Sequence, residues 1–87
     1  MANRARKLPK SIHTEEQKAF CDLMIAARRK TGLRQDKLAE MLGKPQSFVS
    51  KYENGDRRID LVEFVAIAKA LKADPVQLLR ALMKKLR

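Results

Sequence analysis

This sequence offers little material for disulfides, metal clusters or aromatic cores. Its 87 residues include one cysteine, one histidine, one tyrosine, three phenylalanines and no tryptophan. A single cysteine, Cys21, excludes an internal disulfide and a cysteine-cluster metal site, and it is typical of a reducing compartment. The core must therefore come from Leu, Val, Ile, Met and Ala side chains, a composition that favours helices over sheet.

Membrane spans, signal peptides and catalytic clusters are also missing from the sequence. No apolar run approaches the ~18 residues of a membrane-spanning helix, and no apolar stretch follows the basic N-terminus as in a signal peptide. The histidine, His13, has no Asp, Glu or Cys close by until Glu15, and the three glycines stand too far apart for a phosphate-binding loop. We therefore expect a cytoplasmic protein that is not an enzyme and has no metal or cofactor. Cys21 is most simply a small, partly buried hydrophobe.

Acidic residues are scarce relative to basic ones. Twenty Lys and Arg residues against ten Asp and Glu give a formal net charge of +10, so polyanions are the natural partners. The first thirteen residues contain four cations and no acid. We predict that residues 1–13 form a flexible basic arm and that residues 14–87 form the folded domain.

The helix signals begin after this arm. Thr14 offers an N-cap hydroxyl, and Gln17 stands three residues later, as in a capping box. Apolar residues then recur at helical spacing until Gly32, which can take the left-handed position at a helix end. The predicted inner stripe of this first helix is Phe20, Leu23, Met24 and Ala27.

Two short helices are predicted next, separated by a glycine turn. The first runs from Gln35 to Gly43. The second has Val49 and Tyr52 facing inward and ends at Gly55.

Two more helices complete the predicted fold. Asp60 with Glu63 caps a fourth helix, and Asp74 followed by Pro75 opens a fifth. The predicted stripe of the fourth helix is Leu61, Phe64, Val65, Ala68 and Leu71. The predicted inner stripe of the fifth is Val76, Leu79, Met83 and Leu86, with Leu78 and Leu82 to one side. The sequence shows no strand pattern, so the predicted fold class is all-α with five helices.

The second and third helices carry a recognisable motif. Two short helices joined by a turn containing glycine, the second with small polar and basic side chains outward, can lay a helix in the DNA major groove. The stretch QDKLAEMLGKPQSFVSKYENG, residues 35–55, resembles the helix-turn-helix family of phage lambda-type repressors and Cro. The matching positions are Leu38-Ala39, Gly43, Val49 and Glu53-Asn54-Gly55.

This resemblance covers roughly Phe20 to Leu82 and implies a lambda-repressor-like DNA-binding domain. The helix-turn-helix would occupy about residues 35–54. The resemblance also implies an ion pair between Glu53 and Arg28 that fixes the third helix to the first. Ala39 would be small because the two motif helices cross closely there.

The sequence departs from the family pattern at the starts of the second and third helices. Arg34 and Pro45 stand where a Ser or Thr cap is usual, and Lys44 replaces an apolar residue. Cations are unfavourable at helix N-termini, which carry a partial positive charge. A DNA phosphate at each helix start would reverse this effect, so we interpret Arg34 and Lys44 as positioned for the DNA backbone.

The resemblance assigns DNA contacts to particular residues. The outward side chains of the third helix would face base edges, and they are Gln46, Ser47, Ser50 and Lys51. Gln46 could hydrogen-bond to the N6 and N7 atoms of adenine, and Lys51 could hydrogen-bond to the O6 and N7 atoms of guanine. The residues expected to contact the DNA backbone are Arg34, Gln35, Lys44, Asn54, Arg57 and Arg58. Phe48 could either touch thymine methyl groups or complete the core. In the arm, Arg4 or Arg6 could enter the minor groove, or the arm could add only general electrostatic attraction.

A single recognition helix reads few base pairs, so we expect a homodimer on double-stranded DNA, acting at the nucleoid. The apolar surface of the fifth helix offers an interface through Leu78, Leu82, Met83 and Leu86, unless these four pack internally. The predicted function is sequence-specific transcriptional regulation, with repression favoured because occupancy alone can block a promoter. Two alternatives stay open: an antitoxin-like module whose main partner is a protein, and a sequence-indifferent nucleic-acid binder.

Overall fold

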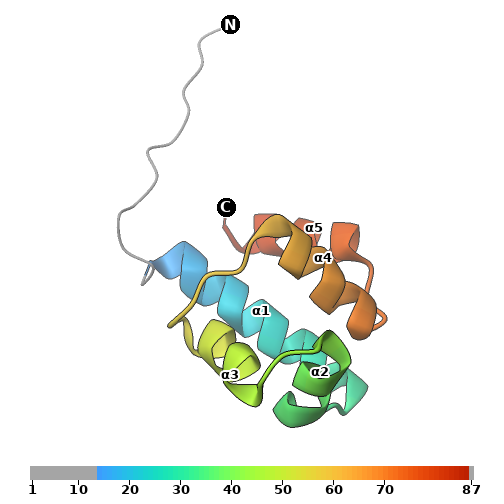
Figure 1. Cartoon of the computed structure of the whole chain (residues 1–87). Helices are drawn as coiled ribbons and strands as arrows, with labels where there is room; N and C mark the ends of the chain where they lie inside the picture. Colours follow the sequence, from blue (N-terminus) through green and yellow to red (C-terminus); the bar gives the residue numbers. More distant parts are fainter. Residues whose placement is uncertain (1–13, 87) are drawn as a thin grey trace, which may run out of the picture.

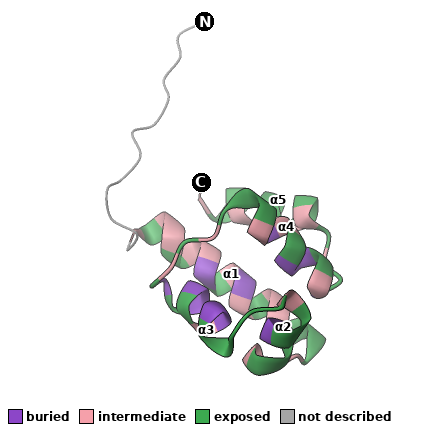
Figure 2. Cartoon of the chain, viewed as in Figure 1, coloured by how far each residue is buried: buried purple, intermediate pink, exposed green. Residues whose placement is uncertain are grey.

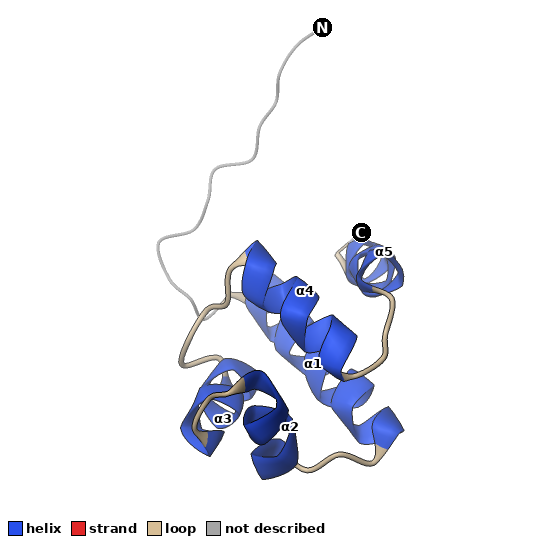
Figure 3. Cartoon of the chain, turned by 45° about the vertical axis from the view of Figure 1, so that its right-hand side comes forward, coloured by secondary structure: helices blue, strands red, loops and turns tan. Residues whose placement is uncertain are grey.

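The computed structural model describes residues 14–86, so the predicted arm (residues 1–13) and the last residue, Arg87, lie outside the described residues. Within residues 14–86 the chain forms helices and no strand (Figure 3). The helices are α1 (Glu15–Thr31), α2 (Gln35–Leu42), α3 (Gln46–Asn54), α4 (Leu61–Ala70) and α5 (Pro75–Lys85). The predicted all-α, five-helix fold is confirmed. None of these helices is both long enough and apolar enough to cross a membrane.

Helix α1 is the central element of the arrangement. It packs against α3 and α5, while α2 packs against α3 and α4, and α4 packs against α5. In Figure 1 the pair α2 and α3 therefore lies on one side of α1, and the pair α4 and α5 lies on the other. The motif helices are held at the edge of the molecule by α1 and α4.

Side-chain caps begin three of the helices where the sequence predicts them. The Thr14 hydroxyl accepts a hydrogen bond from the Gln17 amide at 3.0 Å. At α4 the Glu63 amide donates to Asp60 at 2.7 Å, and the Asp60 amide donates to the Glu63 carboxylate at 2.9 Å, which completes a capping box. Asp74 caps α5, with Pro75 at its first position. These local signals set the helix starts.

The core lies where α1, α2, α3 and α4 meet, and Figure 2 shows the buried residues gathered on their facing sides. Val49 and Tyr52 face inward as predicted, and Phe48 is buried with them. Three members of the predicted α1 stripe are confirmed, because Met24 is buried and Phe20 and Ala27 pack against the core, whereas Leu23 is half-buried outside the core cluster. The buried members of the core cluster are Met24, Leu38, Ala39, Phe48, Val49, Tyr52, Phe64, Ile67 and Leu71.

The predicted stripe of α4 is wrong at one end. Leu61 is 73% exposed, and Ile67, which the prediction omitted, is almost fully buried. The buried stripe is Phe64, Ile67, Ala68 and Leu71, spaced i, i+3, i+4 and i+7, and the predicted Val65 packs against the core as a partly buried residue. Leu61 lies one turn before this stripe, beyond the reach of the core cluster. The first turn of α4 therefore presents an apolar side chain to solvent.

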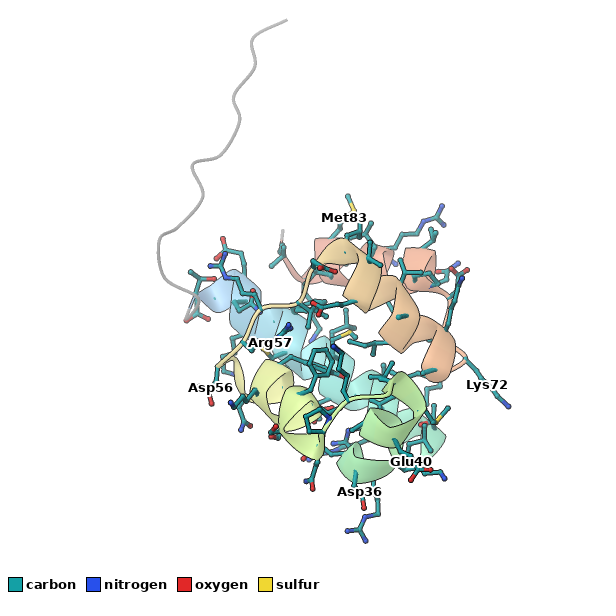
Figure 4. The ribbon with its side chains drawn as sticks, in the orientation of Figure 1. Asp36, Glu40, Asp56, Arg57, Lys72 and Met83 are labelled. Atoms are coloured by element: carbon teal, nitrogen blue, oxygen red, sulfur yellow. The ribbon has the colours of Figure 1, made fainter. Side chains whose placement is uncertain are left out.

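The predicted inner stripe of α5 is also wrong. Val76, Leu79 and Met83 are exposed, whereas Leu78 packs against the core. Figure 4 shows Met83 projecting away from the molecule. The helix has two neighbouring apolar stripes, offset from each other by one position in the sequence. Helical periodicity therefore cannot decide which stripe faces inward. Docking against α1 and α4 turns the stripe of Leu78 and Leu82 toward the molecule.

The turn between α2 and α3 depends on Gly43. Its φ of +66° is a left-handed conformation, and its amide and the Lys44 amide donate to carbonyls of the last turn of α2. Nothing lies within 4 Å of the position that a Cβ would occupy at Gly43. The requirement for glycine is therefore conformational rather than steric.

Gly43→Val is expected to lower the free energy of unfolding by about 1–3 kcal/mol, because a β-branched residue is strained in the left-handed region. For a domain of this size each kcal/mol shifts the melting temperature by about 4–8 °C, so thermal unfolding followed by circular dichroism measures the effect. Gly43→Asn is the matched control, since asparagine tolerates this conformation. Equal melting temperatures for the two variants would show that the turn does not need the left-handed conformation.

Candidate nucleic-acid interface

Helix α3 has two distinct sides. Phe48, Val49, Tyr52 and Glu53 are buried against the molecule. The four residues predicted to read bases lie on the other side: Gln46, Ser47 and Lys51 are exposed, and Ser50 is half-buried. The Ser50 hydroxyl lies 3.3 Å from the Ser47 carbonyl, to which it donates. The predicted base-reading residues thus share one face of a helix that is anchored by its opposite face.

A buried ion pair anchors α3 to α1. The Glu53 side chain is only 2% exposed, and Arg28 donates to its two carboxylate oxygens at 2.7 and 3.0 Å. Arg28 also donates to the Leu33 carbonyl at 2.8 Å. The hydrogen bonds with Glu53 raise the pKa of the Arg28 guanidinium above its ordinary value. The ion pair that the family resemblance implies is confirmed.

Gln35, predicted to contact the DNA backbone, connects the same carboxylate to the start of α3. Its Nε2 donates to Glu53 Oε1 at 2.9 Å, and its Oε1 faces Gln46 Nε2 at 3.5 Å. The first turns of α2 and α3 therefore lie next to each other. Sequence reasoning missed this contact, because helix periodicity carries no information on how two helices approach each other.

The starts of α2 and α3 have no side-chain cap among the described residues, as the sequence predicts. Arg34 is well exposed, and its Nε lies 3.5 Å from Asp36 Oδ1. The Asp36 carboxylate stands in the first turn of α2, whereas the first turn of α3 contains no acid. The unfavourable charge is thus partly compensated within the first turn of α2, whereas the first turn of α3, which Lys44 precedes, offers no acid of its own.

Phe48 belongs to the core, and two cations also contact its ring. Lys44 Nζ lies 5.6 Å from the ring centroid, and Arg57 Cζ lies 4.7 Å from it. Arg57 also pairs with Glu63 at 3.1 Å. Through these contacts Arg57 ties the segment between α3 and α4 to Phe48 on α3 and to Glu63 on α4.

The predicted backbone contact Arg57 therefore already has protein partners. The hydrogen bonds from Arg57 lower the pKa of the Glu63 carboxyl, and the hydrogen bond from the Asp60 amide adds to this effect. In Figure 4 Arg57 lies over the body of the molecule, whereas its neighbour Asp56 projects outward. Arg58, the next predicted contact, is exposed, as is Asn54 at the end of α3. The prediction did not foresee that Glu63 would bind Arg57 in addition to capping α4.

Cys21 and Tyr52 serve packing. The Cys21 thiol is buried and donates to the Tyr52 carbonyl at 3.3 Å. Burial raises the pKa of this thiol, so the reactive thiolate is disfavoured. Burial also raises the pKa of the Tyr52 hydroxyl. Cys21 is more deeply buried than the partly buried position predicted for it.

Comparison with known proteins agrees with this arrangement. The helix-turn-helix family model matches residues 24–78, more than half of the chain. The chain belongs to the helix-turn-helix family. This family match confirms the resemblance noted in the motif and makes the chain a DNA-binding transcription regulator.

Two solved structures resemble this helix-turn-helix protein in both sequence and fold. An XRE-family like protein from Pseudomonas syringae pv. tomato is 42% identical, with a TM-score of 0.79, over 87% of this chain and 93% of that one. The restriction-modification controller protein C.AhdI from Aeromonas hydrophila is 31% identical, with a TM-score of 0.69, over 75% of this chain and 98% of that one.

A third similar structure supports the fold alone. A mutant of the restriction-modification controller protein C.Esp1396I is 19% identical, with a TM-score of 0.77, over 84% of this chain and 97% of that one. A search of curated proteins returned no match.

Proposed function

We propose that this protein binds a specific sequence in double-stranded DNA as a homodimer, reads the major groove with α3 and represses transcription. It would act in the cytoplasm, at the nucleoid. Repression is the simpler mode of action, because a protein that occupies a promoter can block it without further contacts. The basic arm of residues 1–13 would add electrostatic attraction to the duplex.

The observation that carries this proposal is the division of α3 into two sides. Gln46, Ser47 and Lys51 point to solvent from a helix whose other side is fixed by Val49, Tyr52 and the ion pair of Glu53. A major groove about 12 Å wide admits one helix, and base edges there are read by side chains of these types. The cations Arg34 and Lys44 stand beside the starts of α2 and α3, where phosphates would bind.

The dimer proposal rests on an apolar surface at α4 and α5. A groove of about 240 Å³ is lined by Leu61, Leu79 and Leu82 together with residues of α1. Exposed apolar side chains surround it: Val62 next to Leu61, and Met83 one turn after Leu79. Leu78, which was predicted for this interface, also lines the groove and packs against the core, and we add Leu79 and Leu61 to the proposed interface. Such a dimer would present two copies of α3 to half-sites about 34 Å apart.

Two substitutions separate base reading from backbone contact. Gln46→Ala is expected to relax base preference at one position of the site, at a cost of about 1–3 kcal/mol in binding. Arg34→Ala is expected to weaken all sequences alike and to lower the slope of log affinity against log salt by about one. The measurement starts with selection of bound DNA from a random pool, followed by titration of single-base variants of the selected site.

The same experiment tests the alternatives. If both variants weakened every sequence to the same degree, Gln46 would not be a base reader. If the protein selected no preferred site, the sequence-indifferent alternative would be correct. If a stoichiometric protein copurified with the chain from its native host and DNA binding were weak, the antitoxin-like alternative would replace this proposal.

A further inference from the structure

The guanidinium of Arg57 is held by two side chains of the protein. Its Cζ lies 4.7 Å from the centroid of the Phe48 ring, so the ring covers one face of the group. Phe48 is itself fixed, because it is buried and its ring packs edge-on against Tyr52 with 5.5 Å between the centroids. Nη1 and Nη2 of Arg57 donate to the two carboxylate oxygens of Glu63 at 3.3 and 3.1 Å. Arg57 therefore has a set orientation before any ligand binds.

The hydrogen bonds of Arg57 occupy two of the three edges of its guanidinium. The group has five N–H donors in a rigid plane. Glu63 takes the edge between Nη1 and Nη2, and the Arg58 carbonyl accepts the second N–H of Nη1 at 2.9 Å. Within residues 14–86 these contacts leave two N–H groups, one on Nε and one on Nη2, which point the same way along the third edge. Such a parallel pair matches two oxygens of a phosphate.

Arg57 is also accessible to an anion. Its side chain is 40% exposed, whereas that of Glu63 is 24% exposed. Lys44 is exposed, and its Nζ lies 5.6 Å from the centroid of the same Phe48 ring. An anion that approaches this ring therefore meets two cations, while the Glu63 carboxylate faces a different edge of the guanidinium.

We propose that Glu63 is a positioning residue for DNA affinity: together with the Phe48 ring it holds Arg57 so that the edge of Nε and Nη2 binds one backbone phosphate through two hydrogen bonds. This inference rests on the proposed binding of double-stranded DNA, and it gives an acidic residue a favourable part in binding a polyanion. A long side chain loses rotamer freedom when it binds a ligand. Because Arg57 is already held in the free protein, its contact with phosphate costs less.

The variant that tests this role is Glu63→Gln. Glutamine can replace glutamate in a capping box, so α4 should keep its start while the charge that holds Arg57 is lost. Asp56→Asn is the matched control, because Asp56 neighbours Arg57 in the chain and projects outward in Figure 4. Each variant raises the net charge by one, so the general attraction to DNA increases in both. The difference in affinity between them reports the orientation of Arg57.

Affinities are measured for the selected site and for a scrambled duplex at one salt concentration, and melting temperatures from circular dichroism check that each variant is folded. Glu63→Gln is expected to bind about three- to tenfold more weakly than Asp56→Asn, because Arg57 must then be ordered on binding. The loss should be the same for both duplexes, since a phosphate contact carries no sequence information. In an Arg57→Met background Glu63→Gln and Asp56→Asn are expected to bind alike, because the residue that Glu63 positions is gone.

Two results would overturn the proposal. If Glu63→Gln bound as tightly as Asp56→Asn, or more tightly, Glu63 would restrain Arg57 from DNA instead of presenting it. If the loss persisted unchanged in the Arg57→Met background, Glu63 would serve only as the cap of α4.

Failure of the proposed function would give a different result. A protein that selected no preferred site would refute base reading by α3. The comparison of Glu63→Gln with Asp56→Asn on the scrambled duplex would still decide the role of Glu63, because phosphates are present in any duplex.

Discussion

Arg28→Met is expected to destabilise the protein by about 3–5 kcal/mol, because it leaves the carboxylate of Glu53 buried without its cation. That carboxylate is 2% exposed, and among residues 14–86 it would keep only the hydrogen bond from Gln35 at 2.9 Å. Native domains are stable by about 5–15 kcal/mol. The substitution therefore removes a large fraction of the total stability, although Arg28 lies on α1, away from the base-reading face.

Urea unfolding followed by circular dichroism measures this loss. Lys18→Met is the matched control, because Lys18 pairs with Asp22 at 3.1 Å on the exposed side of the same helix. Exposed pairs of this spacing contribute far less to stability than a buried pair does. If the two substitutions cost the same, the ion pair of Arg28 and Glu53 would not hold α3 in place.

Leu79→Glu is expected to convert the proposed dimer to a monomer and to lower affinity for the full site by about 10²–10⁴-fold, because the two half-sites would no longer be bound as one unit. Leu79 is 47% exposed, so the substitution should leave the fold intact while placing a charge on the apolar surface at α4 and α5. Because a two-fold axis would bring both copies of the introduced carboxylate into the same interface, the two like charges would repel each other.

Sedimentation equilibrium and binding to the selected site provide the two readouts. Met41→Glu is the control, because Met41 is 49% exposed on α2 and lies outside the groove lined by Leu61, Leu79 and Leu82. It adds the same charge, so any general repulsion from DNA is common to both variants. A Leu79→Glu protein that stayed dimeric would place the interface elsewhere, and a wild-type monomer at micromolar concentration would exclude the dimer.

The parts of the fold that could be predicted from sequence are those set by neighbours along the chain. Thr14, Asp60 and Asp74 cap their helices because each side chain reaches an amide two or three residues ahead. Gly43 ends α2 because its left-handed conformation suits glycine. Such signals need no knowledge of how the helices pack.

The parts that could not be predicted depend on how helices meet. Both apolar stripes of α5 satisfy helical periodicity, and only docking on α1 and α4 turned Leu78 inward and Leu79 outward. Leu61 continues the spacing of the α4 stripe, yet the core ends before it.

The candidate site shows the same limit. Its outward residues on α3 follow from the helix period, once Val49 and Tyr52 are taken as buried. The contacts of Arg57 with Phe48 and Glu63 do not follow from the helix period, because they depend on the path of the connection between α3 and α4. The contact of Gln35 with Gln46 also needed the three-dimensional structure.

The central claim is that the exposed face of α3 reads a DNA sequence, and one ratio tests it most directly. The affinity for the selected site is compared with that for a scrambled duplex of equal length and composition, at a single salt concentration because salt changes both values. We expect the selected site to bind at least about 10³-fold more tightly. A ratio within about threefold of one would contradict the claim, because the affinity would then come from general electrostatic attraction alone.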